Sequence, residues 1–293
     1  MPYHLLGLAH RRRPATWWRA LVELVALLVL GVALSVGIFI PLGVMSELAG
    51  VDIFAENSTD PLIPLIEVLA IAAMLPAPFL AARIAGRNPR ALLSRALRVR
   101  WGVLWRSLAV VGAVYGVHVL IDVLTASPEP IINPFRIRLL LAFLIAVPLQ
   151  SAAEECVYRG ALPQILGQWR WPAWLAYLVP GVLFVASHVY NWVGLVDIAV
   201  FALCTTLLVW RTGGLEAAVA LHAVGNIMVF GYGALGLLDP METEIMPIDT
   251  ITSSLITVGT TVLLLWVLRD VGPGTKKVST DVQKPLVPAG ATA

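Results

Sequence analysis

Charged residues are scarce in this sequence. Only 13% of its 293 residues are Asp, Glu, Lys or Arg, whereas soluble domains average roughly 25%. This deficit excludes an ordinary water-soluble globule, and the 59% of hydrophobic residues excludes a disordered chain. The formal net charge is only +2, so the chain lacks the basic surface that nucleic acids require, and we expect no nucleic-acid partner.

Cysteine and several catalytic signatures are also missing. The two cysteines, Cys156 and Cys204, lie inside apolar runs, so the sequence offers no disulfide framework. It contains no H-E-x-x-H zinc helix, no G-x-S-x-G serine setting, no Gly-x-Gly-Asp and no glycine-rich phosphate loop. These absences argue against the usual zinc, serine and aspartate proteases of membranes and against nucleotide binding.

Long apolar runs are abundant instead. Runs of about 18–25 residues are long enough to cross the hydrocarbon core of a bilayer as helices, because a backbone in lipid must satisfy its own hydrogen bonds. The sequence therefore predicts an all-α protein, a polytopic bundle with about eight spanning helices in contact with the lipid bilayer. The predicted segments are 18–46, 62–84, 104–125, 137–159, 172–190, 193–210, 215–236 and 250–268.

The charges between these segments alternate in sign and indicate the topology. Arginines at 11–13 precede the first segment, and seven more lie between positions 83 and 106. The loops around 47–60 and 239–249 are acidic. Because basic loops stay on the cytoplasmic side, we expect a multi-pass protein of the cell membrane with both termini in the cytoplasm.

We expect three regions along the chain. Residues 1–17 form a cytoplasmic N-terminal segment, and residues 18–270 form the transmembrane domain, with a motif core at 137–230. The polar tail 271–293, rich in Pro and Gly, is predicted to be a disordered cytoplasmic segment.

Ionisable residues inside membrane segments are costly and point to function. In the run A-A-E-E-C-V-Y-R-G, Glu155 and Arg159 are four residues apart and share a helix face, so we expect them to pair. The adjacent Glu154 points about 100° away and lacks a local cation. A structural role explains Glu155 well but leaves Glu154 unexplained.

Two further clusters carry polar groups at helical spacing. Phe184 and His188 share one face of their segment, and His222 and Asn226 share one face of another. A single histidine or asparagine in a membrane helix usually serves packing. Two histidines, an asparagine and a double glutamate within the last five segments favour a site.

These groups match the needs of peptide-bond hydrolysis by water. Glu154 can act as general base together with His188, while His222 and Asn226 can donate hydrogen bonds to the developing oxyanion. An alternative is that His188, His222 and Glu154 bind a divalent metal such as zinc, with a position open for water. The residues alone leave both schemes open.

The motifs E-E-x-x-x-R, F-x-x-x-H and H-x-x-x-N occur in this order on separate segments across residues 137–230. This set resembles the CPBP family of intramembrane proteases, which comprises type II CAAX prenyl endopeptidases and Abi bacteriocin-processing enzymes. Its members are often called metalloproteases.

The resemblance implies a membrane helix bundle with a cavity that opens toward the cytoplasm. It implies that Glu154 and His188 activate water and that His222 and Asn226 form the oxyanion site. It also implies that Glu155 and Arg159 brace the cavity.

This scheme requires Glu154 and His188 to lie at similar depths in the membrane. Glu154 would lie near one end of its helix if that helix ended at Arg159, far from His188. We therefore predict that the helix continues to about Leu166, which draws Glu154 toward the middle of the bilayer.

The function favoured by the sequence is an intramembrane endopeptidase that acts on a membrane-proximal or lipid-anchored peptide or protein substrate. The first alternative is a non-catalytic membrane scaffold or bacteriocin-immunity protein, in which the same residues hold helices together. A transporter is a weaker alternative, because no internal repeat is visible.

Overall fold

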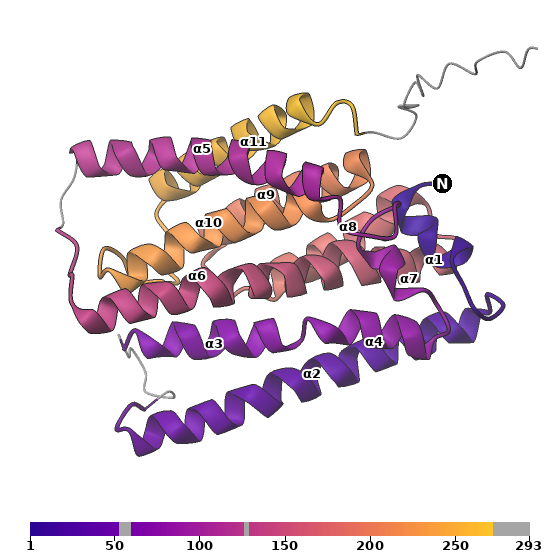
Figure 1. Cartoon of the computed structure of the whole chain (residues 1–293), viewed down its shortest axis with the longest axis horizontal. Helices are drawn as coiled ribbons and strands as arrows, with labels where there is room; N and C mark the ends of the chain where they lie inside the picture. The colour runs from indigo at the N-terminus through magenta and orange to yellow at the C-terminus, as the bar shows by residue number, and fades with distance from the viewer. Residues whose placement is uncertain (53–59, 126–128, 272–293) are drawn as a thin grey trace, which may run out of the picture.

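The computed structural model describes residues 1–52, 60–125 and 129–271, and the predicted tail lies almost wholly outside them. The described residues form helices, with two isolated β-bridges and no strand (Figure 1). The elements are η1 Tyr3–Leu5, α1 Leu6–Ala9, α2 Trp17–Leu48, α3 Leu62–Ala73, α4 Pro76–Ile84, η2 Pro89–Leu92, α5 Trp101–Thr125, α6 Pro134–Glu155, η3 Cys156–Ala161, α7 Leu162–Gln168, α8 Ala173–Ala186, α9 Trp192–Thr212, α10 Glu216–Ala234 and α11 Pro247–Val267.

The predicted helical bundle is confirmed, with one short member. Seven helices of the described chain are long and apolar enough to cross a membrane, counting α3–α4 and α6–η3–α7 as one each. The eighth apolar segment contains α8, which has 14 residues instead of the 19 predicted for 172–190. At about 1.5 Å per residue, α8 is about 21 Å long and falls short of the roughly 30 Å hydrocarbon core.

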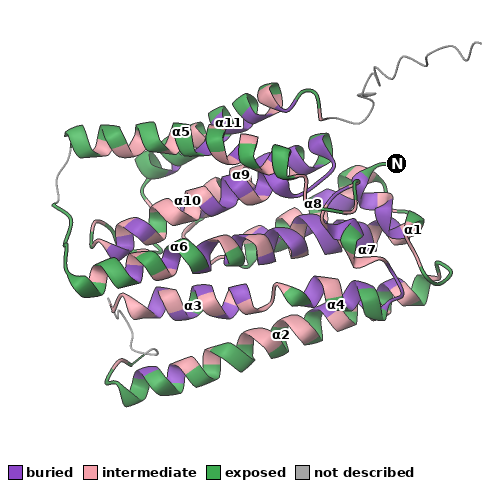
Figure 2. Ribbon diagram, viewed as in Figure 1, coloured by how far each residue is buried: buried purple, intermediate pink, exposed green. Residues whose placement is uncertain are grey.

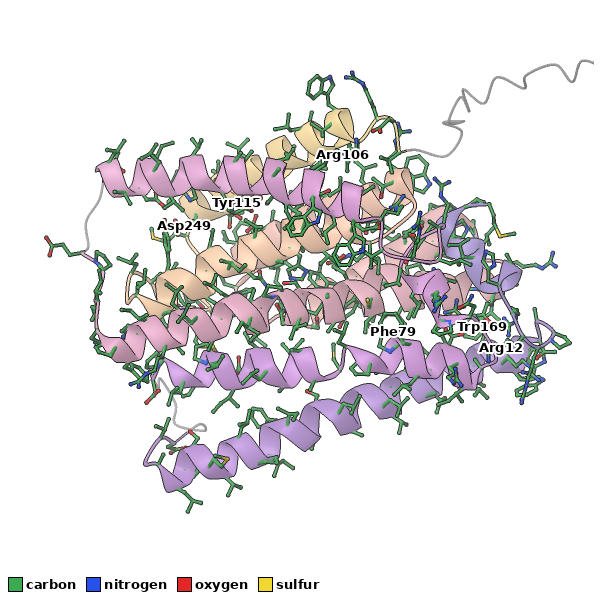
Figure 3. The ribbon with its side chains drawn as sticks, viewed as in Figure 1. Arg12, Phe79, Arg106, Tyr115, Trp169 and Asp249 are labelled. Atoms are coloured by element: carbon green, nitrogen blue, oxygen red, sulfur yellow. The ribbon has the colours of Figure 1, made fainter. Side chains whose placement is uncertain are left out.

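The bundle places α10 near its centre and α2 and α5 at its edges (Figure 1). Half of the most apolar window of α10 is buried, against only 6% of the corresponding windows of α2 and α5. Figure 2 shows the exposed residues of α2 along one edge and those of α5 along the opposite edge. Apolar side chains project outward from both helices (Figure 3). Such surfaces suit lipid rather than water.

The helix that carries the double glutamate continues beyond Arg159, as predicted. Helix α6 passes through the π-helical segment η3 into α7 and ends at Gln168. Pro163 has no N–H for the carbonyl of Arg159, which removes one α-helical hydrogen bond beside this segment. Because the helical stretch extends 14 residues beyond Glu154, this residue lies well inside it rather than at its end.

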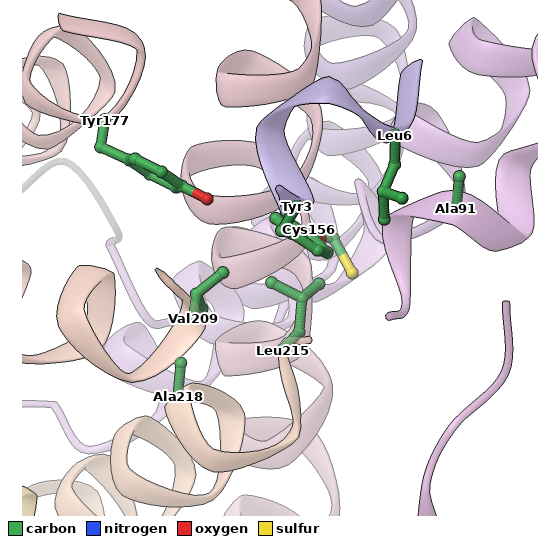
Figure 4. Close-up of a cluster of buried hydrophobic side chains, with 8 residues drawn as sticks. All are labelled: Tyr3, Leu6, Ala91, Cys156, Tyr177, Val209, Leu215 and Ala218. Carbon is green, nitrogen blue, oxygen red and sulfur yellow. The ribbon is translucent and has the colours of Figure 1, made fainter. Parts of the chain in front are cut away.

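The first residues of the chain fold back onto the bundle. Tyr3 and Leu6 are almost fully buried and pack with Cys156 of η3 (Figure 4). The Tyr3 hydroxyl donates a hydrogen bond to the carbonyl of Leu92. Residues 3–9, within the predicted cytoplasmic segment, therefore cover the end of the bundle that lies next to the double glutamate.

A buried ion pair fixes this end of the bundle. Nε of Arg87 lies 2.8 Å from Oε2 of Glu23 in α2, and both side chains are fully buried. Nη1 of Arg87 donates to Gln164 of α7 over 2.6 Å. Because a buried charge needs both a counterion and hydrogen bonds, this network links α2, the segment before η2, and α7.

Candidate active site

The candidate residues gather mainly between α6 and α10. The two helices pack in opposite directions, so that a residue later in α6 faces one earlier in α10. Glu154 and Glu155, at the end of α6, face His222 on α10. One turn away along both helices, Gln150 faces Asn226.

His222 connects the two glutamates. Its Nδ1 atom lies 2.9 Å from Oε1 of Glu155, and its Nε2 atom lies 3.3 Å from Oε2 of Glu154. The residue is only 4% exposed, so little water competes for these contacts. A carboxylate, an imidazole and a second carboxylate therefore form a continuous line across the helix interface.

The predicted pair of Glu155 and Arg159 is confirmed. Nη1 of Arg159 lies 3.1 Å from Oε1 of Glu155, the same oxygen that contacts His222. The guanidinium carbon lies 4.1 Å from the ring centre of Phe184, which is cation–π geometry. Nε and Nη2 of Arg159 have no hydrogen-bond partner in the described part of the chain. Arg159 thus supplies a buried positive charge that balances Glu155.

His188 lies beyond the end of α8 rather than inside a helix. Its Nδ1 atom is 2.7 Å from the carbonyl oxygen of Phe184. Because a carbonyl only accepts hydrogen bonds, Nδ1 donates this bond, and in a neutral imidazole the second nitrogen, Nε2, is then the acceptor. The Phe184 ring stands 4.7 Å from the His188 ring and 6.1 Å from the His222 ring, centre to centre. Phe184 therefore links the two imidazoles through ring contacts.

Asn226 is held by a residue that the sequence analysis did not select. Its Nδ2 atom donates to Oε1 of Gln150 over 3.1 Å. Gln150 lies four residues before Glu154 on α6, and this helical spacing would have pointed to it. Phe201 of α9 was also not selected, although its ring packs edge-on against His222 at 4.9 Å between centres.

The packing of α10 against α5 also depends on a small residue. A side-chain carbon at Gly225, next to Asn226, would lie 3.3 Å from the hydroxyl of Tyr115. Tyr115 reaches from α5 toward α10 (Figure 3). A glycine at this position therefore permits the close approach of the two helices beside the site.

The side chains predicted to bind a metal have other partners in this structure. Within residues 1–52, 60–125 and 129–271, no group of three or more His, Cys, Asp or Glu is arranged to hold a metal ion. Both ring nitrogens of His222 face carboxylates, and Nδ1 of His188 faces a carbonyl. Zinc binding by His188, His222 and Glu154 stays a prediction.

Comparison with known proteins gives two matches. Residues 136–228 match the model of the family described as type II CAAX prenyl endopeptidase Rce1-like, which confirms the resemblance drawn from the three motifs. The chain is also 33% identical over 101 residues to the uncharacterized protein YyaK of Bacillus subtilis (strain 168). That match covers 32% of this chain and 33% of YyaK, so it spans about a third of that protein. No solved structure matches the chain.

Proposed function

We propose that the chain is an intramembrane endopeptidase, because residues 136–228 match the model of the Rce1-like type II CAAX prenyl endopeptidase family and the described residues include seven helices long and apolar enough to cross a membrane. Its substrates would be peptide bonds in membrane-proximal or lipid-anchored proteins. The observation that carries the proposal is the line of Glu154, His222 and Glu155 inside the bundle.

In the proposed reaction, Glu154 is the general base. It takes a proton from a water molecule while the water oxygen forms a bond to the carbonyl carbon of the substrate. His188, whose Nε2 keeps a lone pair, would accept the second hydrogen bond of this water. When the C–N bond breaks, the proton held by Glu154 goes to the leaving nitrogen, so that atoms and charge balance.

His222 would exchange this proton with Glu154, because its Nε2 atom faces that carboxylate. This role differs from the oxyanion role expected from the sequence, since Nε2 would have to leave Glu154 to reach a substrate oxygen. Glu155 keeps the hydrogen of His222 on Nδ1, and Arg159 is the counterion of Glu155. Asn226 would then supply the oxyanion hydrogen bond through its amide N–H.

Mapping the peptide termini of the membrane proteome tests the proposal. Cells that carry the native protein, Glu154→Ala or Glu67→Ala would be compared. Glu67 is the control, because it is a carboxylate within the apolar run of α3 and belongs to none of the three motifs. We expect new termini with the native protein and with Glu67→Ala, but none with Glu154→Ala. Identical termini with Glu154→Ala would refute the proposal and favour a non-catalytic scaffold or immunity protein.

The orientation in the membrane follows from the same proposal. We propose that the chain lies in the cell membrane with both termini in the cytoplasm, as the loop charges indicate. Cysteines introduced singly at Arg12 and at Asp239 would test this with an impermeant thiol reagent on whole cells. We expect labelling at position 239 alone, and labelling at position 12 alone would reverse the orientation.

A further inference from the structure

Gln150 is a buried polar residue that belongs to none of the three motifs. It lies on α6, is 5% exposed, and accepts a hydrogen bond through Oε1 from Nδ2 of Asn226. The hydroxyl of Ser151 donates to the same oxygen over 3.2 Å. Two donors converge on Oε1, and this fixes which end of the Gln150 amide faces Asn226.

The contact is in register with the contact between Glu154 and His222. Gln150 precedes Glu154 by four residues on α6, and Asn226 follows His222 by four residues on α10. The two pairs are therefore successive contacts across one helix interface. Any shift of α10 along α6 would displace both pairs together.

A hydrogen-bond donor for an oxyanion must be oriented before the reaction begins. The Asn226 amide has two N–H groups, and the hydrogen bond to Gln150 occupies one of them. That bond limits rotation of the amide and leaves the second N–H in a defined direction. Without an acceptor on α6, the Asn226 amide would be free to turn among its rotamers.

The geometry points to Gln150 as a positioning residue that orients the carboxamide of Asn226 for the oxyanion. This inference rests on the proposed function, because it assigns Gln150 to the same reaction. Gln150 itself contacts neither water nor substrate in this scheme, and it acts only through Asn226.

Kinetic measurements with Gln150→Met, Asn226→Ala and the double variant test the inference. The probe is a quenched fluorescent peptide that spans a bond identified by terminus mapping. We expect Asn226→Ala to lower kcat by about 10²–10³-fold. Gln150→Met should lower kcat by about tenfold or more with KM within about twofold, and the double variant should match Asn226→Ala alone.

Gln164→Met is the matched control. It removes a buried glutamine from the same continuous helix, one that binds Arg87 and the carbonyl of Ala91 rather than a candidate catalytic residue. It should lower thermal stability and leave kcat per folded molecule unchanged. If Gln150→Met lowers kcat by the same factor in the Asn226→Ala background, or not at all in the native one, the inference is wrong.

A second measurement separates this inference from the proposed function. The side-chain amide of Asn226 can be followed by NMR as hydrogen exchange of its ¹⁵N-labelled NH₂ group, which needs no substrate. We expect faster exchange in Gln150→Met and native exchange in Gln164→Met. Unchanged exchange in Gln150→Met would overturn the inference even if the protein is a protease. If exchange is faster in Gln150→Met but the native protein cleaves no peptide, the restraint of Asn226 by Gln150 is confirmed and only the proposed function is refuted.

Discussion

Glu155 accepts a hydrogen bond from His222 and pairs with Arg159 through one and the same oxygen, at 2.9 Å and 3.1 Å. Its second oxygen has no hydrogen-bond partner in the described part of the chain. Glu155 is therefore the group through which the charge of Arg159 reaches the imidazole. In the proposed reaction, the second glutamate of the motif would therefore orient His222.

Replacement of Glu155 by Gln should damage both stability and activity. The buried guanidinium of Arg159 loses its counterion, which should cost about 3–5 kcal/mol of unfolding free energy. kcat should fall on the order of 10²-fold or more, because His222 loses the charge that orients it. Denaturation and cleavage of the quenched peptide measure the two effects. The control is Asp270→Asn, which breaks an exposed pair with Arg106 and should cost below about 1 kcal/mol.

Removal of the Arg87 charge should destabilise the fold without touching the site. Arg87→Met leaves the carboxylate of Glu23 buried and unpaired, so we expect a loss of about 3–5 kcal/mol. The double variant Glu23→Gln/Arg87→Met should be more stable than Arg87→Met alone, because no unpaired charge remains. Thermal unfolding in detergent tests this order. A double variant that is less stable than both single variants would contradict the buried-charge explanation.

A methyl group at Gly167 should displace the N-terminal residues. Its added carbon would overlap the carbonyl oxygen of His4, which packs directly against this glycine. We expect Gly167→Ala to lower the melting temperature and to expose residues 3–9 to limited proteolysis. Gly112→Ala on α5 is the control, since nothing lies within 4 Å of that position. Equal protection of the N-terminus in both variants would count against the packing described for η1.

Stability should depend on pH through His4, which lies outside the spanning helices. Burial lowers the pKa of His4 below its usual value of about 6.5. The unfolded chain therefore binds this proton more readily than the folded chain, and stability should fall as the pH drops below about 6.5. His4→Phe keeps a ring next to Tyr177 and removes the titration. Melting curves between pH 5 and 8 should show a smaller loss for this variant, and an identical loss would exclude His4 as a cause.

The positions of the side chains that could bind a metal lead us to expect catalysis without a bound metal. Within the part of the chain that the structure describes, no three His, Cys, Asp or Glu side chains are arranged to hold a metal ion. Cleavage of the quenched peptide should survive treatment with a chelator, and metal analysis of the purified protein should find less than one zinc per chain. Loss of cleavage that added zinc restores would show that the site rearranges around a metal.

The number and order of the apolar helices could be predicted from the sequence, because lipid imposes both length and composition. The Glu155–Arg159 pair was also predictable, because helical spacing alone brings the two residues together. The early end of α8 was not predictable. Val189, Tyr190 and Trp192 keep the sequence apolar at the place where the backbone leaves the helix.

The contacts of His222 could not be predicted from the local sequence pattern. Spacing places His222 and Asn226 on one face of α10, but the partner of that face depends on how α10 packs along α6. That register results from many side chains distributed over both helices. The sequence therefore predicted the shared face of His222 and Asn226 but not the position of the His222 ring between two glutamates.

The docked N-terminus sets an order for biogenesis. Tyr3 packs among residues of η2, η3, α8, α9 and α10, and the last of these, Leu215 and Ala218, lie far along the chain. A ribosome must therefore synthesise most of the protein before the binding place of Tyr3 exists. Residues 3–9 are therefore synthesised well before their binding place exists, and their protection marks a bundle whose assembly is complete.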